Sequence, residues 1–473
     1  MTAEHPRVGG YRGWVFASRL GLLFGPWSIA VAAGVLAFGL VALSLLRRAQ
    51  ALDLPAYDNA FFQQVVWNVG HRGGFSAGFF PADFLGLHFS PLLVLPAFLE
   101  LAWPDPRLLS LLHALALSAS APAAFLFLRA LLGDRARGDW VAAALAAPLP
   151  FWAELQQAAR AGFHTEALAL PLVLLAGWAG LSARPRLAWV LALVALTARE
   201  DVAYSVAVMG LLLFFHGPSR RLGVGIAATA LAWALVSEEI LMPGLRGEVV
   251  SQVDNYYRWL YTASPQAVAG ALLAPAGWVA FAGMIAGMAG LSLLRPGWFT
   301  LTLPPLAAAL LSAHHPQPEL LFQYGLPLVV PVVVAGGLGA AWLMDRTQAR
   351  PPYWVVAVAA VPALLIGLLF GPLSRGPQAS SQALQQLQGC TSAIPARAAV
   401  AADDAAALPL ASRPVLKLST EAASSDFLLV DLEGRMPAYV DAARRQAVLE
   451  GLPGGRRLLC ADGRFQLWSP ANA

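Results

Sequence analysis

The sequence predicts a polytopic α-helical membrane protein, with about eleven transmembrane helices and a small C-terminal α/β domain. Hydrophobic residues make up 58% of the 473 residues and charged residues only 12%, whereas a soluble domain carries about 25% charged residues. Apolar runs of membrane-spanning length recur from Pro26 to Leu373 and are separated by short loops that contain arginine or proline. From Ser374 onward the composition becomes that of a soluble protein.

The first apolar run, from Trp27 to Leu46, is too long for the core of a signal peptide and is followed by Arg47 and Arg48. We therefore interpret it as the first retained span, preceded by a cytoplasmic tail over residues 1–25. The spans expected within the membrane domain (residues 26–373) are 26–46, 107–132, 140–158, 166–182, 186–198, 201–216, 222–242, 266–294, 297–312, 322–343 and 352–373.

The arginines predict the orientation of these spans. With the N-terminus in the cytoplasm, most loop arginines fall on the cytoplasmic side, as the positive-inside rule requires. They include Arg135, Arg184, Arg220, Arg295 and Arg346, whereas Arg47 and Arg48 lie on the other side and oppose the assignment. This orientation places the C-terminal domain, residues 374–473, outside the cytoplasm. We expect the protein to lie in the bacterial inner membrane.

The segment from His88 to Trp103 decides the number of crossings. It is apolar but contains two prolines and Glu100, and it offers about 15 residues where a span needs about 20. If it crossed, every later loop would change sides. We expect an interfacial or re-entrant helix inside one long outer loop over residues 47–106.

The C-terminal domain reads as helices over 378–387 and 439–450, strands over 398–402, 414–418 and 426–432, and a hairpin over 458–468 around Asp462-Gly463. It holds both cysteines of the chain, Cys390 and Cys460. In an oxidising compartment these would form a disulfide. The alternative is a pair of buried free thiols.

Polar motifs gather on the outer face of the predicted topology. Ionisable groups near lipid depth are costly, so each is a functional candidate. The motifs are Tyr57-Asp58-Asn59 with Gln63, Gln64, Trp67 and Asn68; His88-Phe89-Ser90-Pro91; Gly162-Phe163-His164-Thr165-Glu166; Arg199-Glu200-Asp201-Val202; and His314-His315 with Gln323-Tyr324. None matches a zinc-protease helix, a phosphate-binding glycine loop or a serine-nucleophile elbow. Lys417 is the only lysine and no basic tract carries interleaved aromatics, which excludes nucleic acid as an expected partner. Taken singly, Glu154, Glu238, Glu239 and His113 read equally well as helix–helix contacts.

The motifs YDNAFFQQVVWN, LGLHFSPLL, GFHTEALALPL and AREDVA, in this order, resemble an uncharacterised family of bacterial and archaeal multi-pass membrane proteins. The usual family pattern is close to YDLGIFDQ…WN, HFSP, FHPEA and KEDV, so this chain differs at Gln63 and Arg199. The family is similar in layout to the GT-C glycosyltransferases, including protein mannosyltransferases. The resemblance implies a polyprenyl-phosphate sugar donor and an essential aspartate in the first outer loop.

By this resemblance Asp58 is the general base. The alternative is that Asp58 caps a helix over residues 59–69, which aspartate does well. Arg199 is the candidate for the leaving phosphate because arginine presents paired donors to phosphate; its alternative is an ion pair with Glu166, Glu200 or Asp201. Arg258, among aromatic residues, is the second candidate cation or part of an interfacial aromatic belt.

The wider candidate set for substrate and phosphate binding is His88, His164, Glu166, Arg199, Glu200, Asp201, Arg258, His315 and Tyr324. Four of these, His88, His164, Glu166 and His315, are of types that bind divalent metals, although their spacing is not diagnostic. The sequence therefore predicts a membrane glycosyltransferase acting on a glycan, lipid or protein acceptor. A transporter or flippase of lipid-linked sugars and a non-catalytic membrane scaffold remain alternatives.

Overall fold

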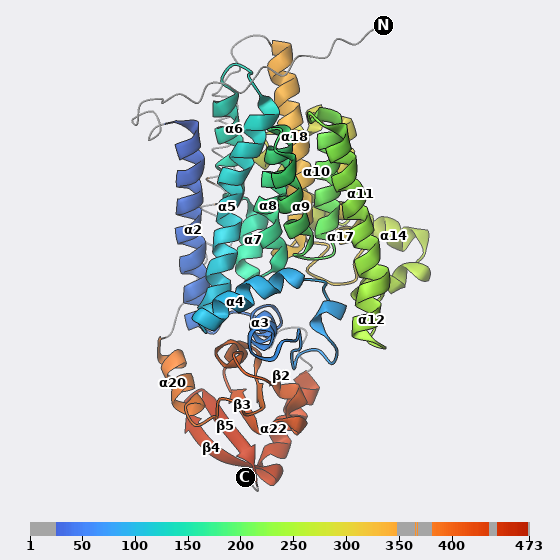
Figure 1. Cartoon of the computed structure of the whole chain (residues 1–473). Helices are drawn as coiled ribbons and strands as arrows, with labels where there is room; N and C mark the ends of the chain where they lie inside the picture. Colours follow the sequence, from blue (N-terminus) through green and yellow to red (C-terminus); the bar gives the residue numbers. More distant parts are fainter. Residues whose placement is uncertain (1–24, 348–364, 366, 368–380, 435–441, 472–473) are drawn as a thin grey trace.

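The computed structural model describes residues 25–347, 365, 367, 381–434 and 442–471. A helical bundle stands above a smaller α/β domain formed by the C-terminal residues (Figure 1). The predicted N-terminal tail over 1–25 and the predicted span over 352–373 lie almost wholly outside the described residues.

Five helices of the described part are long and apolar enough to cross a membrane: Pro26–Gln50 (α2), Arg107–Leu132 (α5), Arg220–Arg246 (α11, Arg220–Val236; η5, Ser237–Leu241; α12, Met242–Arg246), Pro265–Gly287 (α14, Pro265–Leu272; α15, Pro275–Gly287) and Phe322–Thr347 (η9, Phe322–Gly325; α18, Leu326–Thr347). Four apolar helices are shorter: Pro91–Ala102 (η3, Pro91–Leu93; α4, Val94–Ala102), α8 (Thr165–Leu181), α9 (Pro185–Leu196) and α10 (Val202–His216). The structure is thus a multi-pass helical bundle, and the number of eleven spans stays a prediction.

Three predicted spans are not continuous helices. The span over 140–158 divides into α6 (Gly138–Ala146), η4 (Leu149–Phe151) and α7 (Ala153–Ala161), and the span over 297–312 into α16 (Pro296–Phe299), η8 (Thr300–Thr302) and α17 (Leu303–Leu310). Prolines 148 and 150 explain the first break, because proline lacks an amide proton and clashes with the preceding turn. Likewise, the predicted span over 266–294 breaks before Pro275 and ends in η7 (Leu291–Leu294).

Close helix packing builds the bundle around α5, which contacts α2, α6 and α8. At Gly34 of α2, an added Cβ would lie 3.0 Å from the carbonyl oxygen of Ser118 in α5. A small residue here lets the two backbones approach, as is usual between helices in membranes.

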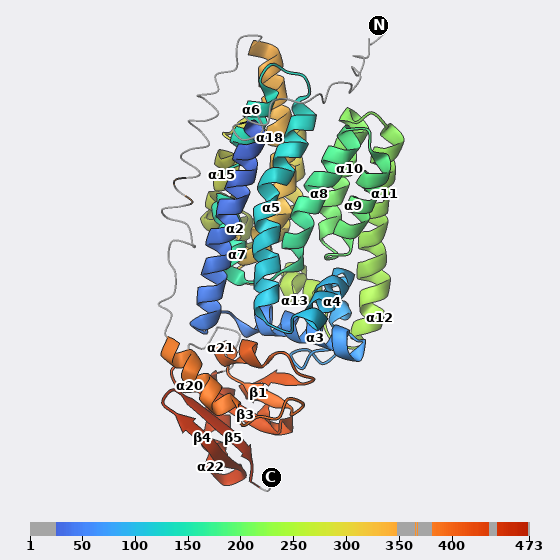
Figure 2. The ribbon, with the colours of Figure 1, turned by 60° about the vertical axis from the view of Figure 1, so that its left-hand side comes forward.

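The first outer loop covers the end of the bundle that faces the C-terminal domain (Figure 2). It contains η1 (Ala56–Ala60, a π-helical turn), α3 (Phe61–Arg72), η2 (Phe84–Gly86), η3 and α4. The helix Pro91–Ala102 rises only about 18 Å, well short of the bilayer's roughly 30 Å core, and exposes Leu95, Phe98 and Leu101. Near this end, α13 (Gln252–Tyr257) and η6 (Arg258–Tyr261) complete the layer.

The C-terminal domain is a five-stranded mixed sheet with the order β2-β1-β3-β5-β4. Its strands are β1 (Val400–Ala402), β2 (Leu416–Leu418), β3 (Phe427–Asp431), β4 (Arg456–Asp462) and β5 (Phe465–Pro470), and its helices are α20 (Ser381–Thr391), α21 (Asp404–Ala407), η11 (Leu408–Leu410), η12 (Ser419–Ser424) and α22 (Ala442–Gly455). β1 is parallel to β2 and β3, whereas β5 is antiparallel to β3 and β4. The predicted hairpin forms, with Gly463 at φ +55° in its turn. A disulfide between Cys390 and Cys460, whose Cα atoms are 5.5 Å apart, ties α20 to β4.

Candidate functional site

The Asp58 turn is held against the loop that precedes α8. Asn59 donates its side-chain N–H to the carbonyl oxygens of Pro55 (3.1 Å) and Ala161 (3.0 Å), and its Oδ1 accepts the N–H of Phe163 (3.3 Å). Gly162 has φ +97°, and a Cβ at this position would collide with the Asn59 side chain. Glycine is therefore required here for both conformation and space.

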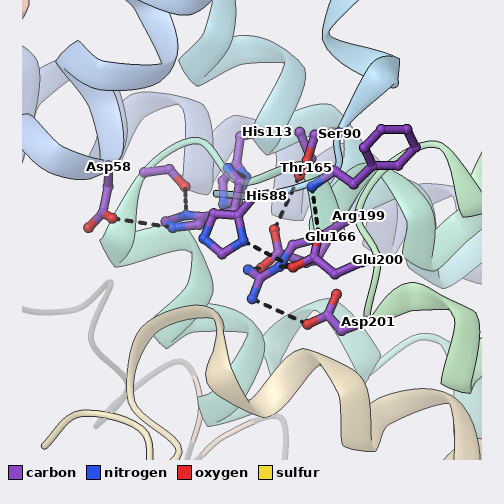
Figure 3. A network of polar contacts seen from close by, with 12 residues as sticks. Asp58, His88, Ser90, His113, Thr165, Glu166, Arg199, Glu200 and Asp201 are labelled. Atoms are coloured by element: carbon purple, nitrogen blue, oxygen red, sulfur yellow. Dashed lines mark hydrogen bonds and ion pairs between the residues drawn. The ribbon is translucent and has the colours of Figure 1, made fainter. Parts of the chain in front are cut away.

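Asp58 faces a buried imidazole, with its Oδ1 3.4 Å from Nε2 of His164 (Figure 3). Nδ1 of the same ring lies 3.3 Å from the carbonyl oxygen of Gly162. Because a carboxylate and a carbonyl oxygen only accept, both contacts favour the protonated form of the His164 ring. Burial lowers the pKa of His164, but the hydrogen bond and charge of Asp58, with Glu166, outweigh it and raise the pKa overall.

His113 supports this pair from α5. Its Nδ1 accepts the backbone N–H of His164 (3.3 Å), and its Nε2 lies 3.1 Å from the carbonyl oxygen of Ala158. One nitrogen thus accepts and the other donates, which is the pattern of a neutral ring. His113 is a buried helix–helix contact, the alternative that the sequence left open.

A second cluster forms around Arg199, in the loop between α9 and α10 (Figure 3). Its guanidinium pairs with Glu166 of α8, with Glu200 (3.4 Å) and with Asp201 (3.3 Å). The ion-pair alternative is therefore present, with all three carboxylates at once.

The loop over residues 47–106 contacts Glu200 and fixes the orientation of its carboxylate. The two carboxylate oxygens of Glu200 meet Nδ1 of His88 (3.0 Å) and the N–H of Phe89 (2.8 Å). Burial raises the pKa of Glu200, but His88 and Arg199 outweigh it and lower that pKa to about 2. Burial raises the pKa of Asp201 to about 7, against the charge of Arg199 and with help from Glu166 and Glu200. Asp201 is thus the group of this loop that titrates near neutral pH.

A cavity of about 450 Å³ opens beside the Arg199 cluster. Its polar wall is formed by His88, Glu166, Arg199, Glu200, Asp201, Glu238, Arg246, Gln252, Tyr256, Tyr257, Gln317, Gln323 and Tyr324. Apolar residues of α11 and α17 complete it, among them Leu231, which is 60% exposed. The cavity is therefore amphipathic, with a charged interior and an apolar side at the bundle surface.

Three polar atoms of this wall are buried and have neither a hydrogen-bond nor an ion-pair partner among the described residues: Oδ1 of Asp201, Oε1 of Gln317 and Oε1 of Gln323. Buried polar atoms are nearly always paired in folded proteins. Unpaired acceptors in the wall of one cavity are therefore suited to a ligand rich in hydroxyl groups.

Asp58 lies within electrostatic reach of the cavity. Burial raises the pKa of Tyr256. Arg199 and Tyr324 oppose this rise, whereas the charge of Asp58 adds to it. Tyr256 also stacks on the ring of His314, with centroids 4.9 Å apart. The charges of Asp58 and Arg199 thus both act on Tyr256.

The comparison with protein families decides the identity of the chain. Residues 48–437 match the family described as predicted membrane protein (DUF2079). The chain belongs to the DUF2079 family. This result confirms the resemblance drawn from the four motifs, and no curated protein matches the chain.

Two solved structures are similar to this DUF2079 protein at low sequence identity. ArnT from Cupriavidus metallidurans, bound to undecaprenyl phosphate, is 10% identical with a TM-score of 0.48, covering 92% of this chain and 97% of ArnT. The archaeal oligosaccharyltransferase AglB from Archaeoglobus fulgidus, in complex with an inhibitory peptide and a dolichol-phosphate, is 11% identical with a TM-score of 0.42, covering 95% of this chain and 75% of AglB.

Four predicted site residues of the DUF2079 protein do not line the cavity: Asp58, His164, Arg258 and His315. The His315 side chain is 84% exposed and pairs with Glu319 at 3.5 Å, whereas its neighbour His314 contacts the rings of Tyr256 and Tyr324. Arg258 is exposed and does not line the cavity. Only the fold of the loop before η9 could decide which of two adjacent histidines turns inward.

Sequence reasoning missed Arg246. It lines the cavity and makes no ion pair with the described residues. The available signal was its position, because it follows the apolar run 222–242 on the side predicted to be outer, where few of the loop arginines fall.

The predicted metal ligands do not converge. His88 pairs with Glu200, His164 with Asp58 and His315 with Glu319. Within the described ranges, no group of three or more His, Cys, Asp or Glu side chains is arranged to hold a metal ion. These residues therefore do not fit a divalent-metal centre.

Part of the first motif attaches the C-terminal domain. Gln63 donates to Oγ of Ser412 (3.1 Å), and Gln64 donates to the carbonyl oxygen of Arg413 (3.3 Å) while accepting the N–H of Gly78 (2.7 Å). The family's usual aspartate at position 63 is thus replaced by a residue that donates to the C-terminal domain.

Proposed function

We propose that this DUF2079 protein is a membrane glycosyltransferase. It transfers a sugar from a polyprenyl-phosphate-linked donor to an acceptor hydroxyl at the extracytoplasmic face, where the C-terminal domain lies. The observation that supports this most directly is the amphipathic cavity, whose wall carries the cations Arg199 and Arg246 and buried acceptor atoms without a partner among the described residues.

Asp58 is the general base of this proposal. Its side chain is 31% exposed, so an acceptor can reach it, and His164 fixes its orientation. The acceptor hydroxyl gives its proton to the Asp58 carboxylate as its oxygen bonds to the anomeric carbon of the sugar. The bond from that carbon to the phosphate oxygen breaks, and the polyprenyl phosphate leaves with the electron pair.

The leaving phosphate needs a cation, and the cavity offers two. Arg199, the residue favoured by the sequence, is already balanced by three carboxylates. Arg246 makes no ion pair with the described residues, so we assign it the first contact with the phosphate and Arg199 a supporting one. The sugar would contact Tyr256, Tyr257 and the glutamines of the cavity wall. The isoprenoid tail would lie along the α11 side of the cavity.

The test compares Asp58→Asn with wild type in transfer from labelled polyprenyl-phosphate sugars by purified protein in detergent. We expect turnover to fall about 100-fold or more, the usual scale of acid–base catalysis. Asp53→Asn is the matched control, because Asp53 is a partly exposed carboxylate of the same loop that pairs with Arg48. Its turnover should stay within about twofold of wild type.

Equal turnover of Asp58→Asn and wild type would refute the assignment of the base. Absence of transfer by wild type with every donor tested, together with movement of labelled donor across proteoliposomes, would establish the transporter alternative instead.

A further inference from the structure

A second hollow, of about 550 Å³, lies where α10 ends and α16 begins. It is lined by Leu211, Phe215 and His216 of α10, by Arg295, Pro296, Gly297 and Trp298, and by Leu301 of η8. α10 leads from the Arg199 loop toward the end of the bundle opposite the C-terminal domain (Figure 1). The two hollows thus lie along opposite halves of α10, the first beside Ala203 and Tyr204 and the second beside Leu211, Phe215 and His216.

This hollow combines a free cation with aromatic walls. Arg295 is half-buried and makes no ion pair or side-chain hydrogen bond with any described residue. The ring of Trp298 lies 5.6 Å from that of His216 and 6.0 Å, edge to face, from that of Phe215. Phe215 is 66% exposed, so its side of the hollow faces the surroundings of the bundle.

The charge around the hollow is one-sided. No carboxylate is found among the residues that line it. Beyond the lining, the charge of Arg135 also acts on His216, and this arginine is already paired with Asp345 at 2.6 Å. Arg295 is therefore a cation without a counter-ion among the described residues, and an anion that enters the hollow meets no repelling group from its lining.

We propose that this hollow binds the headgroup of an anionic phospholipid. The lipid phosphate pairs with Arg295, the headgroup and glycerol lie against Trp298 and His216, and an acyl chain follows Phe215 and Leu211. Basic pockets between helices on the cytoplasmic side are suited to such headgroups, because the cytoplasmic leaflet carries a negative surface potential. Tryptophan at the membrane–water interface favours the same position. The apolar outer side selects a lipid rather than a free phosphate ion.

The experiment uses the full-length protein in detergent and native mass spectrometry with phosphatidylglycerol or phosphatidylcholine of identical acyl chains. We expect wild type to retain phosphatidylglycerol in preference to phosphatidylcholine. Arg295→Gln should weaken phosphatidylglycerol retention about fivefold, the effect of one cation near an anionic lipid surface. The matched control is Arg221→Gln, an exposed arginine in the first turn of α11 that does not line the hollow, and it should leave retention unchanged.

Equal retention of the two lipids by wild type would overturn the proposal, and this comparison needs no variant to fold. An equal loss in both arginine variants would also overturn it, because the effect would then come from the general charge of this end. Displacement of the lipid by millimolar inorganic phosphate would show an anion site without lipid selectivity, against the proposal. A melting temperature of Arg295→Gln close to wild type, with selective loss of phosphatidylglycerol, would establish it.

Discussion

Asp404 links the C-terminal domain to the turn that carries Asp58. Its Oδ1 accepts the backbone N–H of Ala56, the first residue of the π-helical turn, at 2.9 Å. A hydrogen bond to a charged group contributes about 1.5–3 kcal/mol. Because this one is only part-buried, we expect the lower part of that range, about 1.5–2 kcal/mol, for Asp404→Ala. That free energy corresponds to an opening of the turn roughly 10 to 30 times more often.

Hydrogen exchange measured by mass spectrometry tests this value. Amides of residues 57–66 should exchange about 10 to 30 times faster in Asp404→Ala than in wild type, since exchange reports local opening. The control is Asp426→Ala. It removes a hydrogen bond of the same kind inside the C-terminal domain, in which Oδ2 of Asp426 accepts the N–H of Ala399 at 2.9 Å. Unchanged exchange in Asp404→Ala, or an equal acceleration in both variants, would refute the view that this domain holds the Asp58 turn.

Three further predictions follow from the remaining geometry. Because the pKa of His164 is raised, its pair with Asp58 contributes its full stabilisation below about pH 6.5, and this stabilisation is lost as the pH rises through the raised pKa. His164→Gln should therefore lower the melting temperature more at pH 6 than at pH 9. An equal loss at both pH values would contradict the ion pair. Cys390→Ser opens a cross-link between residues 70 apart in sequence, which costs up to about 4 kcal/mol on the chain-entropy model; a C-terminal domain of unchanged resistance to urea and protease would contradict this. In intact cells an impermeant thiol reagent should label a cysteine at Ser251 but not one at Ser219, and the reverse pattern would invert the orientation.

The sequence by itself determined the class of the protein and predicted which polar motifs form its candidate site. The scarcity of charge and the recurring apolar runs required a membrane bundle, because no soluble surface can be built from so few charged residues. The order of the polar motifs identified the family. Ionisable residues near lipid depth are costly, so a sequence keeps them only where they are needed. The alternating pattern around Asp462-Gly463 predicted the hairpin, because its turn needs a residue that tolerates positive φ.

Only the tertiary structure decided what each polar residue contacts. Arg199 could equally have met phosphate or carboxylates, and the packing of α8 against the Arg199 loop brings Glu166 to it. His314 and His315 are alike in sequence, yet only His314 meets the aromatic wall of the cavity. Such contacts join residues far apart in the chain, so they depend on how helices pack rather than on local pattern. The same physical reason explains Arg246, which joins the site only through the packing of α12 against η2.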